Sequence, residues 1–185
     1  IDGVINPVTA DFLDDAIKRA HSKKAGALVV ELDTPGGLDL SMREMIKDIL
    51  SSEVPVVVFV GPAGSRAASA GVFITYAASV AAMAPGTNIG SAHPVSMAGK
   101  MDEVMSKKVE NDAVAYLKGI AAKRGRNAEW AEKAVRESVS ITEREALRLR
   151  VIDVVAESLP DLLEKIDGVR GHADHLALRS AYHDP

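Results

Sequence analysis

Hydrophobic positions along the chain fall into two patterns, short continuous runs and longer stretches with a helical period. The continuous runs are residues 27–32, 56–60 and 80–84, which are rich in Val, Ala and Leu and short enough to be strands buried on both faces. Between them, at 9–23 and 38–50, apolar residues recur at intervals of three and four. This alternation predicts an α/β fold, with a mostly parallel sheet and flanking helices built from repeated βαβ units.

Capping residues define where several of the predicted helices begin. Thr9 stands before the first periodic stretch, and we expect it to be the N-cap of a helix that runs to about Lys23. Asn127 is expected to cap a short helix, and Thr142 followed by Glu145 has the spacing of a capping box. The second half of the chain therefore contains at least two short helices.

The remaining segments differ in how strongly they are patterned. Residues 104–122 have one apolar helical face, 151–155 read as a last strand, and 159–166 as a last helix. Residues 88–103 are rich in Asn, Gly, Ser, Pro and Met without a period, so we expect a long loop there. We expect one domain at 1–167, followed by a tail at 168–185 that is disordered or ordered only by a partner.

Composition narrows the function classes. The chain has 185 residues, 26% of them charged, with a net charge of −4, which argues against a nucleic-acid-binding surface. It has no cysteine, so disulfides, thiol nucleophiles and thiolate metal sites are excluded, and we expect neither a metal nor a cofactor. No apolar run approaches the roughly 18 residues of a transmembrane helix. The chain as given is expected to be soluble, and its start at Ile1 is consistent with a fragment of a longer protein.

Two turns follow predicted parallel strands at their carboxyl ends, and they should therefore lie at the same sheet edge. The first is 33–37, with sequence Asp-Thr-Pro-Gly-Gly, and the second is 61–71, which leads from a strand into a helix. Ser69 lies in the second among Ala and Gly, where small neighbours allow a substrate backbone to approach its hydroxyl. Glycine N–H groups of the first turn and the N–H after Ser69 could form an oxyanion hole. The alternative is that Ser69 only permits tight helix packing.

A serine nucleophile requires a base, and the sequence offers two kinds. His93 lies in the expected loop after the third strand and is the histidine best placed to reach Ser69. Lys107 and Lys108 begin the helix that follows this loop, and a lysine desolvated in an apolar pocket becomes a neutral base near pH 7. The default for either lysine is a solvated surface charge.

Four motifs, in this order, resemble the ClpP-class serine proteases, and more closely the membrane-associated protease domain of the NfeD family. They are residues 32–37, 64–71, 84–90 and 141–154, and the resemblance extends from 1 to about 165. Archaeal members of that family cleave the hydrophobic tail of a stomatin-type partner. The resemblance implies a ClpP/crotonase-like fold, a membrane-associated parent protein with this domain on the extracytoplasmic side, and a homodimer or higher homo-oligomer.

The resemblance also implies residue roles. The family nucleophile falls on Ser69, its oxyanion donors on the backbone N–H groups of Gly37 and Ala70, and its lysine base on Lys108, next to Lys107. We expect the substrate to be apolar and to be bound by residues around this dyad. The expected substrate-binding residues are Gly36, Val72, Phe73, Val95, Met97, Met101 and Met105, with Val109 as a further wall.

Two positions depart from the family pattern. The acid of a ClpP-type triad falls on Ser138, so His93 lacks an orienting carboxylate, and the lysine dyad is preferred. Arg150 stands where the family usually has a glycine before the last strand.

The sequence therefore favours a serine endopeptidase that uses a Ser–Lys dyad on hydrophobic peptide segments, with the C-terminal region of a stomatin-like membrane protein as the implied substrate. Three alternatives remain open. They are a ClpP-type protease using His93, a crotonase-like acyl-CoA enzyme, and a peptide-binding domain without activity.

Overall fold

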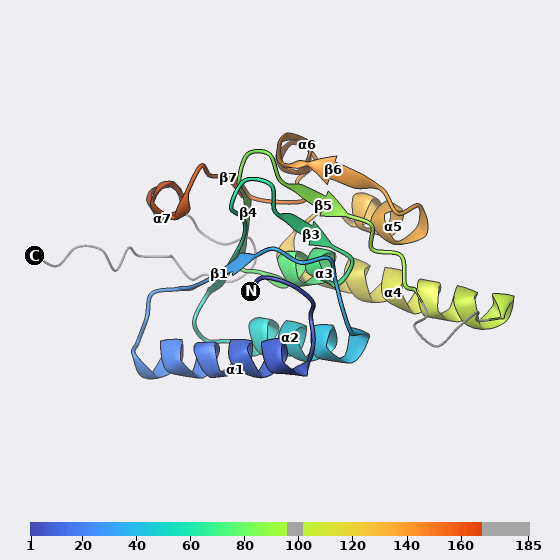
Figure 1. Ribbon diagram of the computed structural model, residues 1–185, viewed down its shortest axis with the longest axis horizontal. Coiled ribbons are helices and arrows are strands. Elements are labelled where there is room, and N and C mark those ends of the chain that lie inside the picture. The colour runs from blue at the N-terminus through green and yellow to red at the C-terminus, as the bar shows by residue number, and fades with distance from the viewer. Residues whose placement is uncertain (96–101, 168–185) are drawn as a thin grey trace, which may run out of the picture.

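The computed structural model describes residues 1–95 and 102–167. Its centre is a four-stranded, fully parallel sheet in the order β1-β2-β4-β7 (Figure 1). The strands are β1 (Leu28–Leu32), β2 (Val56–Val60), β4 (Val80–Met83) and β7 (Val154–Val155). The predicted α/β fold with a parallel sheet and flanking helices is confirmed. The last strand is shorter than expected, since only two of the five residues at 151–155 pair in the sheet.

A second, three-stranded sheet was not predicted. It consists of β3 (Arg66–Ala68), β5 (Asn88–Gly90) and β6 (Ser140–Thr142), with β3 parallel to β5 and β5 antiparallel to β6. The expectation of one loop over 88–103 is therefore wrong for its first three residues, and residues 96–101 lie outside the described part. Each strand has three residues, which is too short for a period to show in the sequence.

Helices α1 (Pro7–Ser22) and α2 (Asp39–Ser51) pack together on one side of the parallel sheet, at the bottom of Figure 1. The N-cap of α1 is Asn6 rather than Thr9. The side chain of Asn6 accepts from the N–H of Thr9 while that of Thr9 accepts from the N–H of Asn6, a reciprocal capping box. Pro7 can occupy the first helical position because its missing N–H would be unpaired there in any case.

The other helices agree with the predicted pattern. Asn127 caps α5 and Thr142 caps α6 with a capping box, as expected. Arg150, at the position where the family has glycine, adopts the left-handed conformation with φ 58°. The bounds are α3 (Ala70–Ala77), α4 (Glu103–Arg124), α5 (Ala128–Arg136), α6 (Glu143–Arg148) and α7 (Leu159–Ile166).

The two faces of the parallel sheet are covered unequally. Alternate residues of β2 point to opposite faces, so Val56, Val58 and Val60 join the main core while Val57 and Phe59 join a smaller cluster. Helices α1 to α5 contribute to the main core, whereas α7 covers the smaller cluster. The thick, helix-covered side of the sheet therefore contains α2, α3 and α4, which surround the candidate site.

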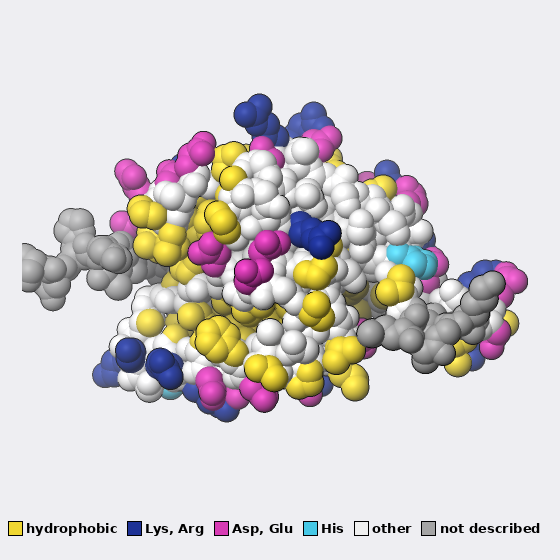
Figure 2. All heavy atoms as spheres, viewed as in Figure 1, with side chains coloured by type: hydrophobic (Ala, Val, Ile, Leu, Met, Phe, Trp, Pro, Cys, Tyr) yellow, Lys and Arg dark blue, Asp and Glu magenta, His cyan; other side chains and the backbone are white. Residues whose placement is uncertain are grey.

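Helix α4 is buried along only part of its length. Its buried residues lie between Ala113 and Arg124, and there it packs against α3 and α5. The first ten residues, 103–112, are exposed or half-buried, and this end of α4 extends to the right edge of the molecule in Figure 1. On the face seen in Figure 2, hydrophobic side chains also gather along the lower edge, over α1 and α2. The exposed hydrophobic residues of these two helices are Val8, Phe12 and Leu40.

Candidate active site

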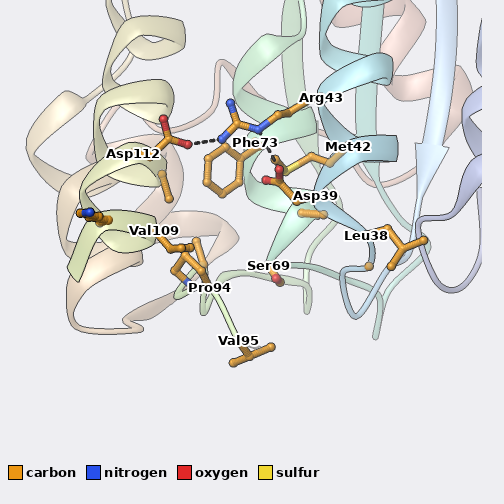
Figure 3. Close-up of a pocket in the computed structure, with 15 residues that line it drawn as sticks. Leu38, Asp39, Met42, Arg43, Ser69, Phe73, Pro94, Val95, Val109 and Asp112 are labelled. Atoms are coloured by element: carbon orange, nitrogen blue, oxygen red, sulfur yellow. Dashed lines mark hydrogen bonds and ion pairs between the residues drawn. The ribbon is translucent and has the colours of Figure 1, made fainter. Parts of the chain in front are cut away.

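A cavity of about 560 Å³ opens between α2, α3, α4 and the segment after β5 (Figure 3). Ser69 lies at its base, between Leu38 on one side and Pro94 with Val109 on the other. Most of its wall is apolar, while one group of charged side chains lies above Phe73. The lining residues are Gly37, Leu38, Asp39, Met42, Arg43, Ser69, Ala70, Phe73, Ala92, Pro94, Val95, Lys108, Val109, Asp112 and Ala113.

Ser69 has a strained backbone at the first position before α3. Its φ is 53° and its ψ is −114°, outside the regions that an L-residue normally adopts. Its N–H donates to the carbonyl of Gly90 at 3.0 Å, and its carbonyl accepts from the N–H of Val72 at 3.0 Å. Its side chain makes no capping hydrogen bond to the helix. Such a conformation costs about 1–3 kcal/mol and is concentrated at functional sites, so packing alone does not account for Ser69.

Thr34, which is fully buried, connects the first turn to the second through hydrogen bonds. Thr34 lies opposite Ala67 in a parallel bridge, in which its N–H donates to the carbonyl of Arg66 and its carbonyl accepts from the N–H of Ala68. Its hydroxyl accepts from the N–H of Gly36 at 3.1 Å. The two turns therefore lie side by side at the sheet edge, as the strand order predicted. Gly36 lies so close to Ser69 that a Cβ at Gly36 would be 2.5 Å from Ser69 Cβ and 3.0 Å from Ser69 Oγ.

Two backbone donors border the cavity without a partner. Within residues 1–95 and 102–167, neither the N–H of Gly37 nor that of Ala70 donates a hydrogen bond. Ala70 is the first residue of α3, where N–H groups lack intrahelical acceptors and the helix dipole favours negative charge. Gly37 is held by the neighbouring N-terminal segment, since Ile5 accepts from the N–H of Leu38 and donates to Gly36. Both N–H groups are thus available to an oxygen in the cavity.

The two candidate lysines lie differently on α4. Lys108 lines the cavity, and among the described residues it makes no ion pair or hydrogen bond. Lys107 does not line the cavity, and its Nζ donates to Glu103 Oε1 at 2.7 Å; both lysines are exposed. Adjacent helical residues point about 100° apart, so only one of the two can face Ser69.

His93 is half-buried and does not line the cavity, although its neighbours Ala92 and Pro94 do. Its Nδ1 hydrogen-bonds to the carbonyl of Val135 at 2.9 Å, so that nitrogen is the donor. No carboxylate hydrogen-bonds to this ring in the part of the chain that the structure describes, and Ser138, at the ClpP acid position, has φ 54°. This arrangement lacks the orienting acid of a Ser–His triad.

The expected apolar walls are only partly in the cavity. Phe73 and Val95 line it, as does Val109. Val72, a residue of α3, is fully buried and does not line the cavity; it lies about 100° around the helix from Phe73. Met105 is 47% exposed and lies outside the lining set. Met97 and Met101 lie outside the described residues.

A charged cluster over the cavity was missed by sequence reasoning. Arg43 of α2 donates from Nε to Asp39 at 2.9 Å and from Nη2 to Asp112 of α4 at 2.5 Å (Figure 3). Its guanidinium carbon lies 4.4 Å from the ring centre of Tyr116, which in turn stacks on Phe73. Although partial burial works against the charge, both carboxylates raise the pKa of Arg43 above its ordinary value. Asp39 and Arg43, four residues apart, were the available signal.

The described residues offer no site for a metal and no membrane-crossing segment. Within 1–95 and 102–167, no three His, Asp or Glu side chains are grouped so that they could hold an ion. No helix in the same ranges is both long enough and apolar enough to cross a bilayer.

Comparison with curated proteins gives two relatives. The chain is 40% identical over 173 residues to the membrane-bound protease PH1510 of Pyrococcus horikoshii, a match that covers 92% of this chain and 39% of that protein. It is 32% identical over 122 residues to membrane protein NfeD1b of Bacillus subtilis, covering 66% of this chain and 26% of that protein. The chain thus spans well under half the length of either relative.

Solved structures agree with these matches. A serine-to-alanine variant of the 1510-N membrane-bound stomatin-specific protease superposes with a TM-score of 0.91 at 37% identity, covering 97% of this chain and 89% of that one. A lysine-to-alanine variant of the same protease, in complex with a substrate peptide, superposes with a TM-score of 0.90 at 36% identity. The match covers 97% of this chain and 84% of that one. ClpP1 from Listeria monocytogenes superposes with a TM-score of 0.68 at 19% identity, covering 88% of this chain and 92% of that one. This match shows a shared fold alone.

The family model for the NfeD1b N-terminal domain matches residues 1–164. The resemblance drawn from the four sequence motifs is therefore confirmed. This chain belongs to the NfeD1b N-terminal domain family and is a homologue of the stomatin-specific membrane protease 1510-N.

Proposed function

We propose that this chain is a serine endopeptidase domain in which Ser69 is the nucleophile and Lys108 the base. One observation carries the proposal. Ser69, strained and without a capping role, borders the same cavity as Lys108 and as the N–H groups of Gly37 and Ala70, which have no acceptor among the residues that the structure describes. A nucleophile, a base and an oxyanion site around one space are the parts that acyl transfer requires. The names of the homologous proteases support the same activity.

In the proposed first step, neutral Lys108 Nζ takes the hydroxyl proton of Ser69 as Oγ bonds to the scissile carbonyl carbon. The carbonyl π electrons move to oxygen, and the N–H groups of Gly37 and Ala70 stabilise this oxyanion. The intermediate then collapses, the C–N bond breaks, and the Lys108 ammonium gives its proton to the leaving amine. Water, deprotonated by the same lysine, attacks the acyl-enzyme, the carboxyl product leaves, and the proton returns to Ser69.

The oxyanion donors are the most preorganised part of this proposal. Each such donor typically contributes about 2.7–4 kcal/mol of transition-state stabilisation. The N–H of Ala70 adds the positive end of the α3 dipole, and Gly37 is fixed by its backbone pairing with Ile5. Because neither donor has another acceptor in the described part of the chain, neither must break a hydrogen bond before it binds the oxyanion.

We propose an apolar peptide segment as the substrate. Phe73, Val95, Met42 and Val109 give the cavity an apolar wall that would disfavour charges beside the scissile bond. A homologue is named as specific for a stomatin homologue, so the C-terminal region of a stomatin-like membrane protein is the proposed physiological source. We further propose that residues 1–167 form the catalytic domain of a membrane-associated, extracytoplasmic and homo-oligomeric parent, with 168–185 as a separate tail.

The test combines covalent labelling with peptide cleavage. We expect a fluorophosphonate probe to label wild-type protein at Ser69 and not the Ser69→Ala variant, as read by mass spectrometry of the intact chain. Wild-type protein should also cut an apolar peptide that the variant leaves intact. A crotonase-like acyl-CoA enzyme would take no label on Ser69, and a peptide-binding domain would bind the peptide without fragments. Cleavage by Ser69→Ala at the wild-type rate would refute the serine mechanism.

The His93 alternative receives less support. A ClpP-type base needs Nδ1 to be oriented by a carboxylate, whereas Nδ1 of His93 donates to the carbonyl of Val135. His93→Ala is therefore expected to retain most of the cleavage activity.

A further inference from the structure

Arg43 joins the two sides of the candidate active site. It comes from α2, directly after the turn that contains Gly37, and its guanidinium reaches Asp112 on α4, the helix that carries Lys108 (Figure 3). The guanidinium also lies over Tyr116 of the same helix, four residues after Asp112. Arg43 thus contacts α4 at two successive turns, next to the exposed half of that helix.

Asp112 is the carboxylate that is positioned to form an ion pair with Lys108. The two residues are four apart on α4 and both line the cavity, so their side chains lie on one face of the helix, where such positions are about 5–6 Å apart at Cβ. A lysine and an acid four residues apart can pair, as Asp14 with Lys18 and Asp161 with Lys165 do in this chain, although those pairs have the acid first and Lys108–Asp112 has the weaker reverse order. Asp112 is bound instead to Arg43.

Asp102 caps α4 by accepting from the N–H of Met105, and the other charged groups around the first half of α4 are in ion pairs with one another. On α4, Glu103 holds Lys107, and Glu110 accepts from Arg136 of α5, which also binds Glu132. Of the charged residues of α2, Asp39 and Arg43 line the cavity and bind each other, and α3 contains no charged residue. In the segment after β5, His93 bonds to a backbone carbonyl. Asp112, at the i+4 position, is therefore the acid on the same face of α4 as Lys108, and its ion-pair partner is Arg43.

We propose that Arg43 is a positioning residue that occupies Asp112 and so keeps Lys108 free to act as the base for Ser69. This inference rests on the proposed function. A carboxylate bound to Lys108 would hold its Nζ as an ammonium, and an ammonium has no lone pair with which to take the serine proton. By engaging Asp112, the guanidinium cancels that charge and turns the carboxylate away from the lysine. The same contact fixes α4 against α2.

The test is the pH dependence of kcat/KM for cleavage of an apolar peptide, measured at low ionic strength because salt screens exposed charges. Arg43→Met keeps the aliphatic stem and removes the charge. Asp112→Asn removes the acid, and the double variant removes both. Arg136→Met is the matched control, since it deletes another arginine that holds α4 through an acid, Glu110, which does not line the cavity. Thermal melting checks that each variant is folded.

The proposal makes a signed prediction for each variant. In Arg43→Met the rise of kcat/KM should move to higher pH by about one unit, which is about a tenfold loss at neutral pH that recovers at alkaline pH. Asp112→Asn should move the rise to lower pH. The double variant should lose the alkaline shift of Arg43→Met, and Arg136→Met should rise at the wild-type pH.

A purely structural role for Arg43 predicts something different. The loss in Arg43→Met would then be equal at all pH values, and removing Asp112 as well would not restore activity. Either result overturns the proposal, as does an alkaline shift of equal size in Arg136→Met. If Arg43→Met fails to fold, Asp112→Asn alone still tests the proposal, because a pH profile of kcat/KM equal to that of the wild type would contradict it. These outcomes are separable from failure of the proposed function, which would show as an active Ser69→Ala variant.

Discussion

The two sides of the cavity are held in different ways. The nucleophile side consists of two turns in which Ser69, Gly36 and Thr34 are fixed by backbone pairing to the strands around them. The base side is the first half of α4, where residues 103–112 are exposed or half-buried and are held mainly by side-chain ion pairs. The first side resists displacement because moving it would break buried hydrogen bonds.

This difference shows where precision is built in and where adjustment is possible. In the proposed mechanism, the oxyanion donors and Ser69 need a fixed geometry before substrate arrives, and a sheet edge provides it. Exposed ion pairs each contribute only about 0–1 kcal/mol, so the base side can move at little cost when a peptide enters. We therefore expect substitutions on the nucleophile side to act through geometry and those on the base side through charge.

The largest effect on the base side should come from Lys108→Ala. Removing a general base costs about 10²–10⁴ in rate, and we expect a loss of at least a thousandfold in kcat with little change in melting temperature. Wild-type activity should rise with pH, since a lysine base works only when neutral, while His93→Ala keeps that profile. Steady-state kinetics with an apolar peptide would measure this, and an inactive His93→Ala with an active Lys108→Ala would reverse the assignment.

On the nucleophile side, Gly36→Ala should reduce kcat about a hundredfold or more. The new Cβ would lie 2.5 Å from Ser69 Cβ and 3.0 Å from Oγ, so the serine must move. Gly36 also has φ +111°, which an alanine adopts only under strain. Gly3→Ala is the control, because Gly3 has the same φ of +111° and no atom lies within 4 Å of the position that its new Cβ would take.

The two glycine variants separate strain from displacement. Both should lower the melting temperature by a similar amount, whereas only Gly36→Ala should lose activity. Equal activity losses in both would mean that backbone strain, rather than contact with Ser69, is responsible.

Features set by local sequence patterns could be predicted from the sequence, whereas features set by contacts between distant residues could not. Helices and the parallel strands were predictable because their periods and caps are local, as with the capping box at Thr142. The three-residue strands β3, β5 and β6 were not, since each is defined by pairing with residues far along the chain. Ser69 and the two turns could be proposed as a site because small residues and strand ends are visible in the sequence. The Arg43–Asp112 contact joins residues 69 positions apart, and no local pattern marks it.

Disrupting the buried ion pair of Arg126 with Asp153 should lower stability while leaving cleavage activity nearly unchanged. The side chain of Arg126 is 2% exposed, and burial lowers its pKa while Asp153, at 2.5 Å, favours the charged form. Asp153 also accepts from the N–H of Ala81 in β4. Asp153→Asn leaves a buried guanidinium without its counter-charge, and we expect a loss of about 2–3 kcal/mol because Asp153 is itself partly exposed.

Denaturant unfolding would measure that loss, and peptide cleavage at 25 °C should stay within about twofold of wild type. Arg126→Met with Asp153→Asn should be less destabilising than Asp153→Asn alone, because no buried charge then remains. If cleavage fell in proportion to stability, the sheet and the site would be more tightly coupled than the fold indicates.

The smallest effect should come from Lys107→Ala, which adjoins the proposed base. Lys107 is paired with Glu103 on α4, and an exposed pair of this kind contributes about 0.3–0.5 kcal/mol. It lies outside the cavity, so its removal should change kcat/KM by less than about twofold and leave the pH profile unmoved. Comparing the activities of Lys107→Ala and Lys108→Ala shows which of the two lysines faces Ser69. An inactive Lys107→Ala with an active Lys108→Ala would mean that α4 rotates by about 100° when substrate binds, a motion that the weakly held base side permits and the nucleophile side does not.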